Sequence, residues 1–340
     1  MSSIFAHAMP EGWPTTASTR PFRAARGFLV ALLCLLLPPM ARADLFAIVG
    51  KSSSDANFVA VAQGCNDDAT AHGDRCELID LPGAANFHRQ SAAVAEVLRS
   101  RRFKGVAISV MSSEAVAKAI QSAGAGTPVI TFDSPFDERH AALGRTYVGI
   151  DNFAFGREQG LVVRARHPQG GTLCLMTERN DPNLAQRVRG VRSALAGTAD
   201  LPEGQPLSGQ DGWTEHARCP WYTSDSVERA LYQTRIALST LGADAFVSVG
   251  HWPILDPAGY AGITEPLRDQ LAANHPTVVV GVGQLDPDQQ QLLDRGLVHA
   301  YVGIDFPRMG GLVYKALRAA ADNETLPPMT ILPVSVSTRK

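Results

Sequence analysis

The fold is decided by the stretch GVAISVMSSEAVAKAIQSAGAGTPVITF, which runs from Gly105 to Phe132. Its two ends, 105–110 and 128–132, are short apolar runs of the kind found in buried parallel strands. Between them, Ser113–Ala123 carries apolar residues three and four positions apart, which is the spacing of an amphipathic helix. Strand, helix and strand in this order predict a right-handed βαβ unit.

The same alternation extends in both directions along the chain. Upstream, strands are expected at Leu45–Val49 and Cys76–Leu81, with helices at Ala56–Ala71 and Arg89–Ser100. A second series follows Gly171, with strands expected at Thr172–Met176, Arg218–Tyr222, Ala245–Val249, Thr277–Val282 and Ala300–Ile304, and helices at Leu184–Leu195, Val227–Leu241, Ile263–Asn274 and Pro287–Asp294. The Gly- and Pro-containing segment Gly197–Gly212 is expected to be a surface loop.

Two such series predict an α/β protein built from two doubly wound parallel sheets. Ligands of these sheets bind at the carboxyl ends of the strands, so functional residues are expected in the loops that follow them. The chain has 340 residues, of which 45% are hydrophobic and 19% charged, with a net charge of -2. This composition excludes a disordered or fibrous protein. It also argues against a nucleic-acid partner, which would require a strongly basic surface.

The first 43 residues are interpreted as an export signal. Three arginines precede the apolar run Gly27–Leu37, and Ala41-Arg42-Ala43 forms a small-residue cleavage pattern that predicts cleavage after Ala43. The run is too short to span a bilayer, which disfavours a retained membrane anchor. Leu33 before Cys34 disfavours lipidation, and Met9 is an alternative start. Removal of four arginines and one glutamate leaves 27 basic and 32 acidic groups, and the protein is expected in the periplasm.

Four cysteines remain after cleavage, at positions 65, 76, 174 and 219. An even number in an exported protein favours disulfides, and three connectivities are possible. We favour Cys65 with Cys76 and Cys174 with Cys219, because each pair then falls within one half of the chain. A metal site is disfavoured, because the sequence has no C-x-x-C motif.

The sequence offers little support for catalysis. A phosphate-binding loop, an H-E-x-x-H helix and a G-x-S-x-G turn are all absent, and the first strand is not followed by the glycine pattern of a dinucleotide site. Asp133, Asp151 and Asp305 do follow strands, but ligand binding or helix capping needs the same placement. We therefore expect a binding protein without a cofactor or metal rather than an enzyme.

At the level of whole motifs, the chain resembles the type 1 periplasmic binding proteins, in particular the ribose-binding-like branch that serves sugar ABC transporters. The resemblance covers about residues 44–336, and it rests on SSSDANFVAVAQG (52–64), PVITFDSP (128–135), YVGIDNFAFGREQG (147–160), NLAQRVRGVRSAL (183–195), DAFVSVGHWP (244–253) and GLVHAYVGIDFPRMG (296–310). Related repressors carry a helix-turn-helix at the N-terminus, where this chain carries the apolar leader.

The resemblance implies two lobes joined by a three-segment hinge that closes on a ligand. The first lobe is expected to comprise residues 44–150 and 305–328, and the second lobe residues 151–304 and 329–340. The chain is expected to cross between the lobes near residues 150–152, 303–305 and 326–333. The partners implied are a small solute and an ABC transporter permease, with the protein itself a monomer.

The resemblance also implies which residues contact a sugar-like ligand between the lobes. The candidates are Asp55, Asn57, Phe58, Asp133, Asn183, Arg187, His251, Trp252 and Gln284. Asp133 matches the family's carboxylate that accepts hydrogen bonds from sugar hydroxyls. Phe58 and Trp252 have core packing as their alternative role, and the alternative for Arg187 is a solvated arginine or one paired at the hinge.

Several departures from the family pattern leave the ligand class open. Ser134 stands where the family often has arginine, Gly283 where it has aspartate, and Ile304 where it has glutamine. We expect capture of a sugar or sugar-like solute for the permease. The alternatives are a sensory subunit for a membrane kinase or chemoreceptor, and a binder of a less polar, amphipathic solute.

Overall fold

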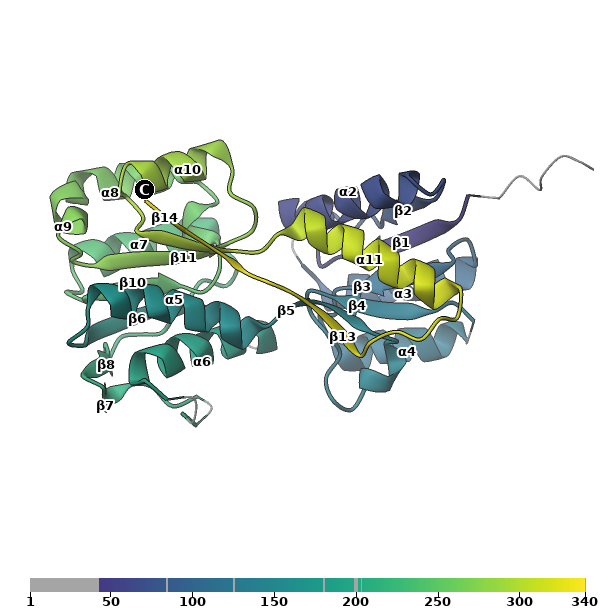
Figure 1. The fold of residues 1–340 in the computed structure, drawn as a ribbon, viewed down its shortest axis with the longest axis horizontal. Coiled ribbons are helices and arrows are strands. Elements are labelled where there is room, and N and C mark those ends of the chain that lie inside the picture. The colour runs from purple at the N-terminus through teal and green to yellow at the C-terminus, as the bar shows by residue number, and fades with distance from the viewer. Residues whose placement is uncertain are drawn as a thin grey trace, which may run out of the picture. The chain divides into compact units, whose positions relative to one another are not determined.

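The computed structural model describes residues 43–83, 85–124, 126–179, 181–198, 201–202 and 204–339. The predicted export signal, residues 1–43, lies outside this range except for Ala43, as do Met9 and Cys34. Two parallel sheets flanked by helices make up the described chain (Figure 1). Each sheet with its helices is called a lobe below.

The first lobe contains a sheet in the spatial order β13-β5-β4-β3-β1-β2, in which every neighbouring pair is parallel. Its strands are β1 (Leu45–Val49), β2 (Arg75–Leu78), β3 (Gly105–Ile108), β4 (Val129–Phe132), β5 (Tyr147–Ile150) and β13 (Met329–Leu332). Its helices are α2 (Ala56–Thr70), α3 (Phe87–Ser100), α4 (Ser113–Ala123), the 3-10 turn η2 (Ala141–Leu143) and α11 (Phe306–Ala321).

The second lobe is built around the order β14-β12-β11-β10-β6-β8-β7, with β9 also paired to β6. Its strands are β6 (Gly171–Thr177), β7 (Ser208–Gln210), β8 (Trp213–Glu215), β9 (Trp221–Tyr222), β10 (Ala245–Ser248), β11 (Thr277–Val282), β12 (Ala300–Gly303) and β14 (Ser335–Thr338). Its helices are α5 (Asn152–Arg166), α6 (Pro182–Ala196), α7 (Val227–Ser239), η3 (Trp252–Ile254), α8 (Pro257–Thr264), η4 (Glu265–Leu267), α9 (Arg268–Ala272) and α10 (Pro287–Asp294).

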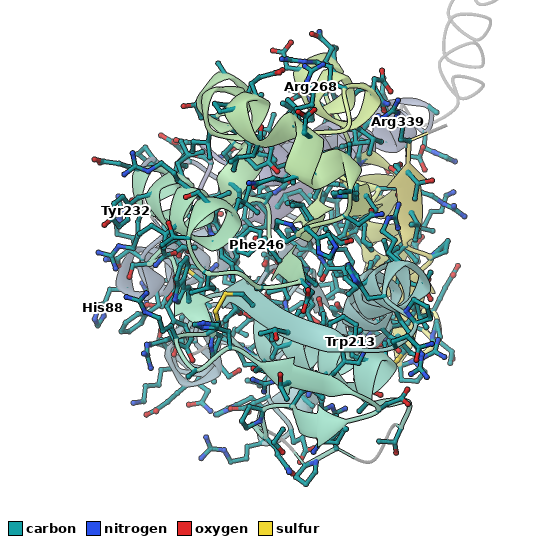
Figure 2. The ribbon with its side chains drawn as sticks, turned by 90° about the vertical axis from the view of Figure 1, so that its left-hand side faces the viewer. His88, Trp213, Tyr232, Phe246, Arg268 and Arg339 are labelled. Carbon is teal, nitrogen blue, oxygen red and sulfur yellow. A yellow bond between two sulfur atoms is a disulfide. The ribbon has the colours of Figure 1, made fainter. Side chains whose placement is uncertain are left out.

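The central strands, such as β3, β4, β10 and β11, are buried along their whole length because helices cover both faces of each sheet. Phe46 and Ile48 of β1 pack in one buried cluster with residues of α2 and α11, whereas Ala47 and Val49 pack in another with residues of α3 and α4. In the second lobe, Phe246 of β10 lies inside, while Tyr232 of α7 lies at the surface (Figure 2). Burial of each large apolar side chain contributes about 1.5–3 kcal/mol.

One helix pair in each lobe packs closely because glycines face the partner helix. A Cβ atom at Gly156 of α5 would collide with the backbone of Arg187 in α6, and one at Gly190 of α6 would collide with the backbone carbonyl of Phe153. In the first lobe, α2 and α11 meet in the same way through Gly64 and Gly310. Glycine is therefore required at these positions by the distance between helix backbones rather than by helix propensity.

The favoured cysteine pairing is confirmed. Cys65 of α2 is bonded to Cys76 of β2, with their Cα atoms 5.9 Å apart. Cys174 of β6 is bonded to Cys219, with their Cα atoms 5.4 Å apart. Each disulfide joins elements of one lobe.

The chain passes between the lobes between β5 and α5, between β12 and α11, and between β13 and β14. Figure 1 shows the last passage as the yellow C-terminal segment. The sequence assignment of residues 329–340 to the second lobe is wrong for 329–332, because Met329 to Leu332 pair in parallel with Tyr147 to Ile150 of β5. Only β14 pairs with the second sheet, antiparallel to β12.

Two further expectations need correction. The segment Gly197–Gly212 is not entirely loop, since Ser208–Gln210 forms β7, which pairs antiparallel to β8. The single helix expected over Ile263–Asn274 is divided into the end of α8, η4 and α9. Pro266 accounts for the division, because proline has no N–H for the helical hydrogen bond.

Candidate functional site

Side chains from both lobes meet where the strands of the two sheets end. Six of them form what we call the interlobe cluster: Lys51 after β1, Ser109 after β3, Asp133 and Ser134 after β4, and Asp181 and Asn183 at the start of α6. In doubly wound sheets this is the edge at which ligands bind. The interlobe cluster is therefore the candidate functional site.

Asp133 is the centre of the cluster. Its Oδ2 atom accepts hydrogen bonds from Ser109 Oγ at 2.7 Å and Ser134 Oγ at 3.2 Å, and it lies 3.5 Å from Lys51 Nζ. The backbone of Asp133 has a φ of 56°, in the left-handed region that non-glycine residues seldom adopt. Such backbone strain is concentrated at functional sites, where surrounding contacts maintain it.

Tyr147 of β5 holds the backbone of Asp133 in its left-handed conformation. Its hydroxyl donates to the backbone carbonyl of Asp133 at 3.0 Å. Burial raises the pKa of the Tyr147 hydroxyl, and the negative charge of Asp133 raises it further. The hydroxyl therefore remains a protonated donor at physiological pH.

The second lobe contacts the same turn through the first residues of α6. Asn183 Nδ2 donates to the Asp133 carbonyl at 3.0 Å and to Ser134 Oγ at 2.8 Å. Asp181 caps α6 by accepting hydrogen bonds from the backbone of Asn183 and Leu184, and its other oxygen lies 3.8 Å from Lys51 Nζ. These contacts link the two lobes directly.

Lys51 supplies a positive charge between two carboxylates. Burial alone would lower the pKa of the Lys51 ammonium, but the carboxylates of Asp133 and Asp181 raise it above its ordinary value. Lys51 therefore stays charged. It places a cationic donor beside Asp133, where the family resemblance implies that a donor is missing because Ser134 replaces arginine.

Arg187 lies behind this cluster and is held within the second lobe. Its Nε donates to Asn152 Oδ1 at 2.8 Å and one terminal nitrogen donates to the Val249 carbonyl at 3.0 Å. Its guanidinium lies 4.2 Å from the ring centre of Phe155, a favourable cation–π arrangement. Burial lowers the pKa of Arg187, and the charges of Asp133 and Asp181 oppose this effect.

A second contact between the lobes joins Asn57 and His251. Asn57 Nδ2 lies 3.3 Å from His251 Nδ1, and Asp55 caps α2 by accepting from the backbone N–H of Asn57 at 2.8 Å. Burial lowers the pKa of His251, with Asp55 opposing the shift. A neutral His251 can accept the hydrogen bond from the Asn57 amide.

The other three candidates lie apart from these contacts. Phe58 is 5% exposed and packs edge-on against Phe132, with ring centres 6.1 Å apart. Trp252 is 6% exposed, belongs to the core of the second lobe and donates its indole N–H to Asp225 at 3.0 Å. Gln284 is exposed, and its side chain forms no hydrogen bond with the described residues.

Sequence reasoning did not select Lys51, Ser109 or Asp181. Each stands at or shortly after the end of a strand, where the βαβ pattern already places functional residues. Asp181 also carries the signature of a helix N-cap, because it precedes Pro182 at the first helical position. The position of a polar residue just after a strand could therefore have identified these three residues as candidates, although it does not show which loops lie close together.

Two hollows of about 620 and 470 Å³ lie outside the interlobe cluster, one along α3 and α4 and the other beside α6 and Tyr222, and neither is lined by a residue of the cluster. The described residues hold no group of three or more His, Cys, Asp or Glu side chains that could bind a metal ion. Within the same residues, no helix has the length and apolar character needed to cross a membrane.

Comparison with known proteins agrees with this architecture. A family model described as a periplasmic binding protein domain matches residues 46–325. No curated protein matches the sequence.

Three solved structures illustrate the similarity of fold. GanP, a glucose-galactose binding protein from Geobacillus stearothermophilus, has 18% identity and a TM-score of 0.70 over 87% of this chain and 98% of its own. A periplasmic solute-binding protein from Actinobacillus succinogenes with bound D-allose has 16% identity and a TM-score of 0.70 over 87% and 98%. A solute-binding protein from Burkholderia graminis in complex with D-arabinose has 20% identity and a TM-score of 0.67 over 88% and 96%.

Proposed function

Because the chain belongs to the periplasmic binding protein domain family, with the type 1 fold, we propose that it captures a sugar or sugar-like solute between its lobes. The observation that carries this proposal is the environment of Asp133. Its carboxylate accepts hydrogen bonds from Ser109 and Ser134 and lies beside the Lys51 ammonium. Asn183 of the second lobe donates to the backbone carbonyl of the same residue.

This set of groups suits a polyhydroxylated ligand. A carboxylate accepts hydrogen bonds from two hydroxyls at once, while an ammonium and a side-chain amide donate to the remaining lone pairs. An amphipathic solute could not bond to the Asn183 amide that now joins the lobes, at about 1–3 kcal/mol for each buried polar group left unpaired. We therefore favour the sugar class over the amphipathic class.

We propose that Asp133, Lys51, Asn183, Asn57 and His251 contact the ligand. Arg187 is proposed to position this surface from behind, with Asp55 setting the start of α2. Phe58 and Trp252 are proposed to pack in the cores of the first and second lobe, beneath the loops that carry Asn57 and His251. Gln284 is proposed to lie at the edge of the binding surface. The solute would replace the direct contacts between the lobes when it binds.

We further propose that the lobes, residues 44–150 with 305–332 and 151–304 with 335–340, move as two bodies about the three passages. In the same proposal, the protein is exported to the periplasm and residues 1–43 are then removed. The mature protein acts as a monomer without a cofactor, binds rather than transforms its solute, and delivers it to an ABC transporter permease. Deletion of the gene should then abolish uptake of the solute. Intact uptake with loss of a transcriptional or chemotactic response would identify a sensory subunit instead.

Calorimetric titration of the exported protein tests the binding proposal. The panel is D-glucose, D-galactose, D-allose, D-arabinose and several polyols, and saturable binding of at least one is expected. Asp133→Asn should weaken that binding about 10- to 100-fold, which corresponds to about 1–3 kcal/mol. Asp137→Asn, at an exposed position four residues further on, serves as the matched control and should bind like the wild type. Absence of saturable binding by the whole panel would overturn the proposal.

A further inference from the structure

Asp44 is held on three sides at the start of the first strand. Its backbone N–H donates to Asp74 Oδ1 at 3.0 Å, and its carbonyl accepts from the Arg75 N–H at 2.9 Å. Its carboxylate lies 3.2 Å from a terminal nitrogen of Arg318. These three interactions hold residue 44 in place at the edge of the first lobe.

Asp74, the acceptor of that N–H, is a buried carboxylate. Its side chain is 5% exposed, and its second oxygen accepts hydrogen bonds from the Tyr314 hydroxyl at 2.9 Å and from Arg318 at 3.1 Å. Burial, followed by the hydrogen bond to Asp74, raises the pKa of Tyr314 to about 12, so Tyr314 remains a neutral donor.

The charges around Asp44 are unequal in number. The three carboxylates of Asp44, Asp74 and Asp322 surround Arg318, and the only other cation bonded to this group among the described residues is Lys104, 3.9 Å from Asp44. Lys104 is 62% exposed and contributes little. Even with Lys104 counted, three negative charges face two positive charges, so at least one positive charge is lacking. The backbone nitrogen of Asp44 already donates to the buried carboxylate of Asp74 at 3.0 Å.

We propose that cleavage of the Ala43–Asp44 bond supplies this charge, and that the new α-ammonium of Asp44 forms an ion pair with Asp74. This inference rests on the proposed export of the protein. Water hydrolyses the peptide bond under the action of a signal-removing peptidase. The C–N bond breaks, Ala43 leaves with a carboxylate, and the Asp44 nitrogen becomes a protonated amine.

The ion pair needs no rearrangement of the fold. The nitrogen already lies 3.0 Å from a carboxylate that is buried before and after cleavage, so only the new ammonium, at a half-buried position, has to lose part of its hydration. A charge-assisted hydrogen bond replaces a neutral donor, and such bonds are about twice as strong. Removal of the export signal therefore stabilises the folded protein as well as releasing it.

The pair makes stability depend on pH in a defined direction. An α-amino group ordinarily has a pKa of about 7.7–8.0, and a carboxylate partner raises it in the folded state. The stabilisation is fully present below about pH 8 and is lost as the pH rises through the raised value. The groups facing the amine are Asp74, the side chains of Asp44 and Arg318, Tyr314 behind Asp74, and Lys104 and Asp322 at the edge.

The test compares two exported proteins that differ only at the N-terminus. One has the natural junction, and the other has Gly-Ser inserted between Ala43 and Asp44, which leaves an amide at residue 44 and moves the ammonium away. Intact mass identifies the first residue of each protein. Urea unfolding is then measured from pH 6 to pH 11, and the same pair is prepared with Asp74→Asn.

We expect the natural protein to begin at Asp44 and to have an unfolding equilibrium constant about tenfold smaller than that of the insertion variant at pH 7, which corresponds to a rise of one pKa unit. The difference should disappear by pH 11 and should be absent in the Asp74→Asn pair. A different first residue, or equal stability of the two proteins at every pH, overturns the inference. Sugar binding by the same samples reports on the proposed function separately, because Asp44 lies outside the interlobe cluster.

Discussion

Asn183 and Asp133 are joined by a hydrogen bond of 3.0 Å from the side-chain amide of one residue to the backbone carbonyl of the other. Asn183 belongs to α6 of the second lobe, and Asp133 follows β4 of the first. A second hydrogen bond, 2.8 Å from the same amide to Ser134 Oγ, makes Asn183 the most direct link between the lobes at the candidate site.

Asn183→Ala removes both of these hydrogen bonds. We expect the affinity for the sugar to fall by about 1–3 kcal/mol, because the solute that replaces these contacts loses the amide that would bind it, at about 0.5–1.5 kcal/mol for each hydrogen bond. Calorimetric titration measures the loss, with Gln291→Ala on the exposed face of α10 as the control. An unchanged affinity would mean that Asn183 does not contribute to the closed, ligand-bound form.

Lys51→Met tests the cation between Asp133 and Asp181. Loss of a hydrogen bond to a charged group costs about 1.5–3 kcal/mol, and we expect sugar affinity to fall by that amount. Asp181→Asn is the matched variant, because asparagine retains the helix cap and removes only the charge that lies 3.8 Å from Lys51. Its effect should be smaller. Equal effects of the two variants would place the importance of Lys51 in joining the lobes rather than in binding the solute.

The half-buried His299 predicts a loss of stability in acid. Val278 N–H donates to its Nδ1 at 2.9 Å, which requires an unprotonated nitrogen there, and burial lowers the pKa of His299. The unfolded chain, with an ordinary histidine pKa of about 6.5, binds the proton more readily. The free energy of unfolding should therefore decrease as the pH falls below about 6.5 and continue to decrease until the folded-state pKa is reached.

Urea unfolding between pH 8 and pH 5 measures this dependence. In His299→Gln the decrease should be smaller, because one of the histidines whose pKa is lowered by burial has been removed. His167 and His251 remain and keep part of the slope. Identical slopes in the two proteins would show that His299 is already protonated in the folded state, or that another group causes the acid sensitivity.

The two disulfides should differ in their contribution to stability. The Cys65–Cys76 bond closes a separation of 11 residues, and the Cys174–Cys219 bond closes one of 45. Loss of a native disulfide costs about 2–4 kcal/mol, and in the chain-entropy model the longer loop contributes about 1 kcal/mol more. Unfolding of the two paired Cys→Ser variants measures the difference, and a larger loss at Cys65–Cys76 would contradict the entropic account.

Two helix glycines, Gly190 in α6 and Gly262 in α8, predict opposite effects of the same substitution. Gly190→Ala places a methyl group against the backbone of Phe153 and should destabilise the protein by about 1–3 kcal/mol. Gly262→Ala, on the exposed side of α8 with open space around it, should stabilise it by about 0.5–1 kcal/mol. Thermal unfolding compares them, and a neutral Gly190→Ala would show that the helix pair can separate without cost.

Much of the fold was predictable because buried parallel strands have a distinctive composition. The helix Ser113–Ala123 was predicted with its observed bounds, and β1 and β11 likewise. Helix α5 was not predicted from the spacing of apolar residues, because Gly156 and Gly160 interrupt its apolar face where α6 packs against it. β13 was assigned to the wrong lobe because an edge strand with exposed Met329 and Ile331 lacks the continuous apolar run of its neighbours.

At the candidate site, the family resemblance implied Asp133, Asn183 and His251, and Asp133 was also noted because it follows a predicted strand. It did not reveal that Lys51 lies against Asp133, since 82 positions of sequence separate them and only the parallel order of β1, β3 and β4 places both loops at one edge. The alternative core roles of Phe58 and Trp252 could not be decided from periodicity, because a residue at the start of an apolar stripe can face either way.

The sequence by itself determined the alternation of strands and helices, the division into two sheets and the set of polar residues at the strand ends, because these depend on local spacing and hydrophobicity. The tertiary structure decided which of those residues meet, which lobe the last strand joins and how the charges around Asp74 and Asp133 are balanced. These properties depend on loops distant in sequence coming within a few ångströms, and such distances follow from sheet order and helix packing rather than from any local pattern.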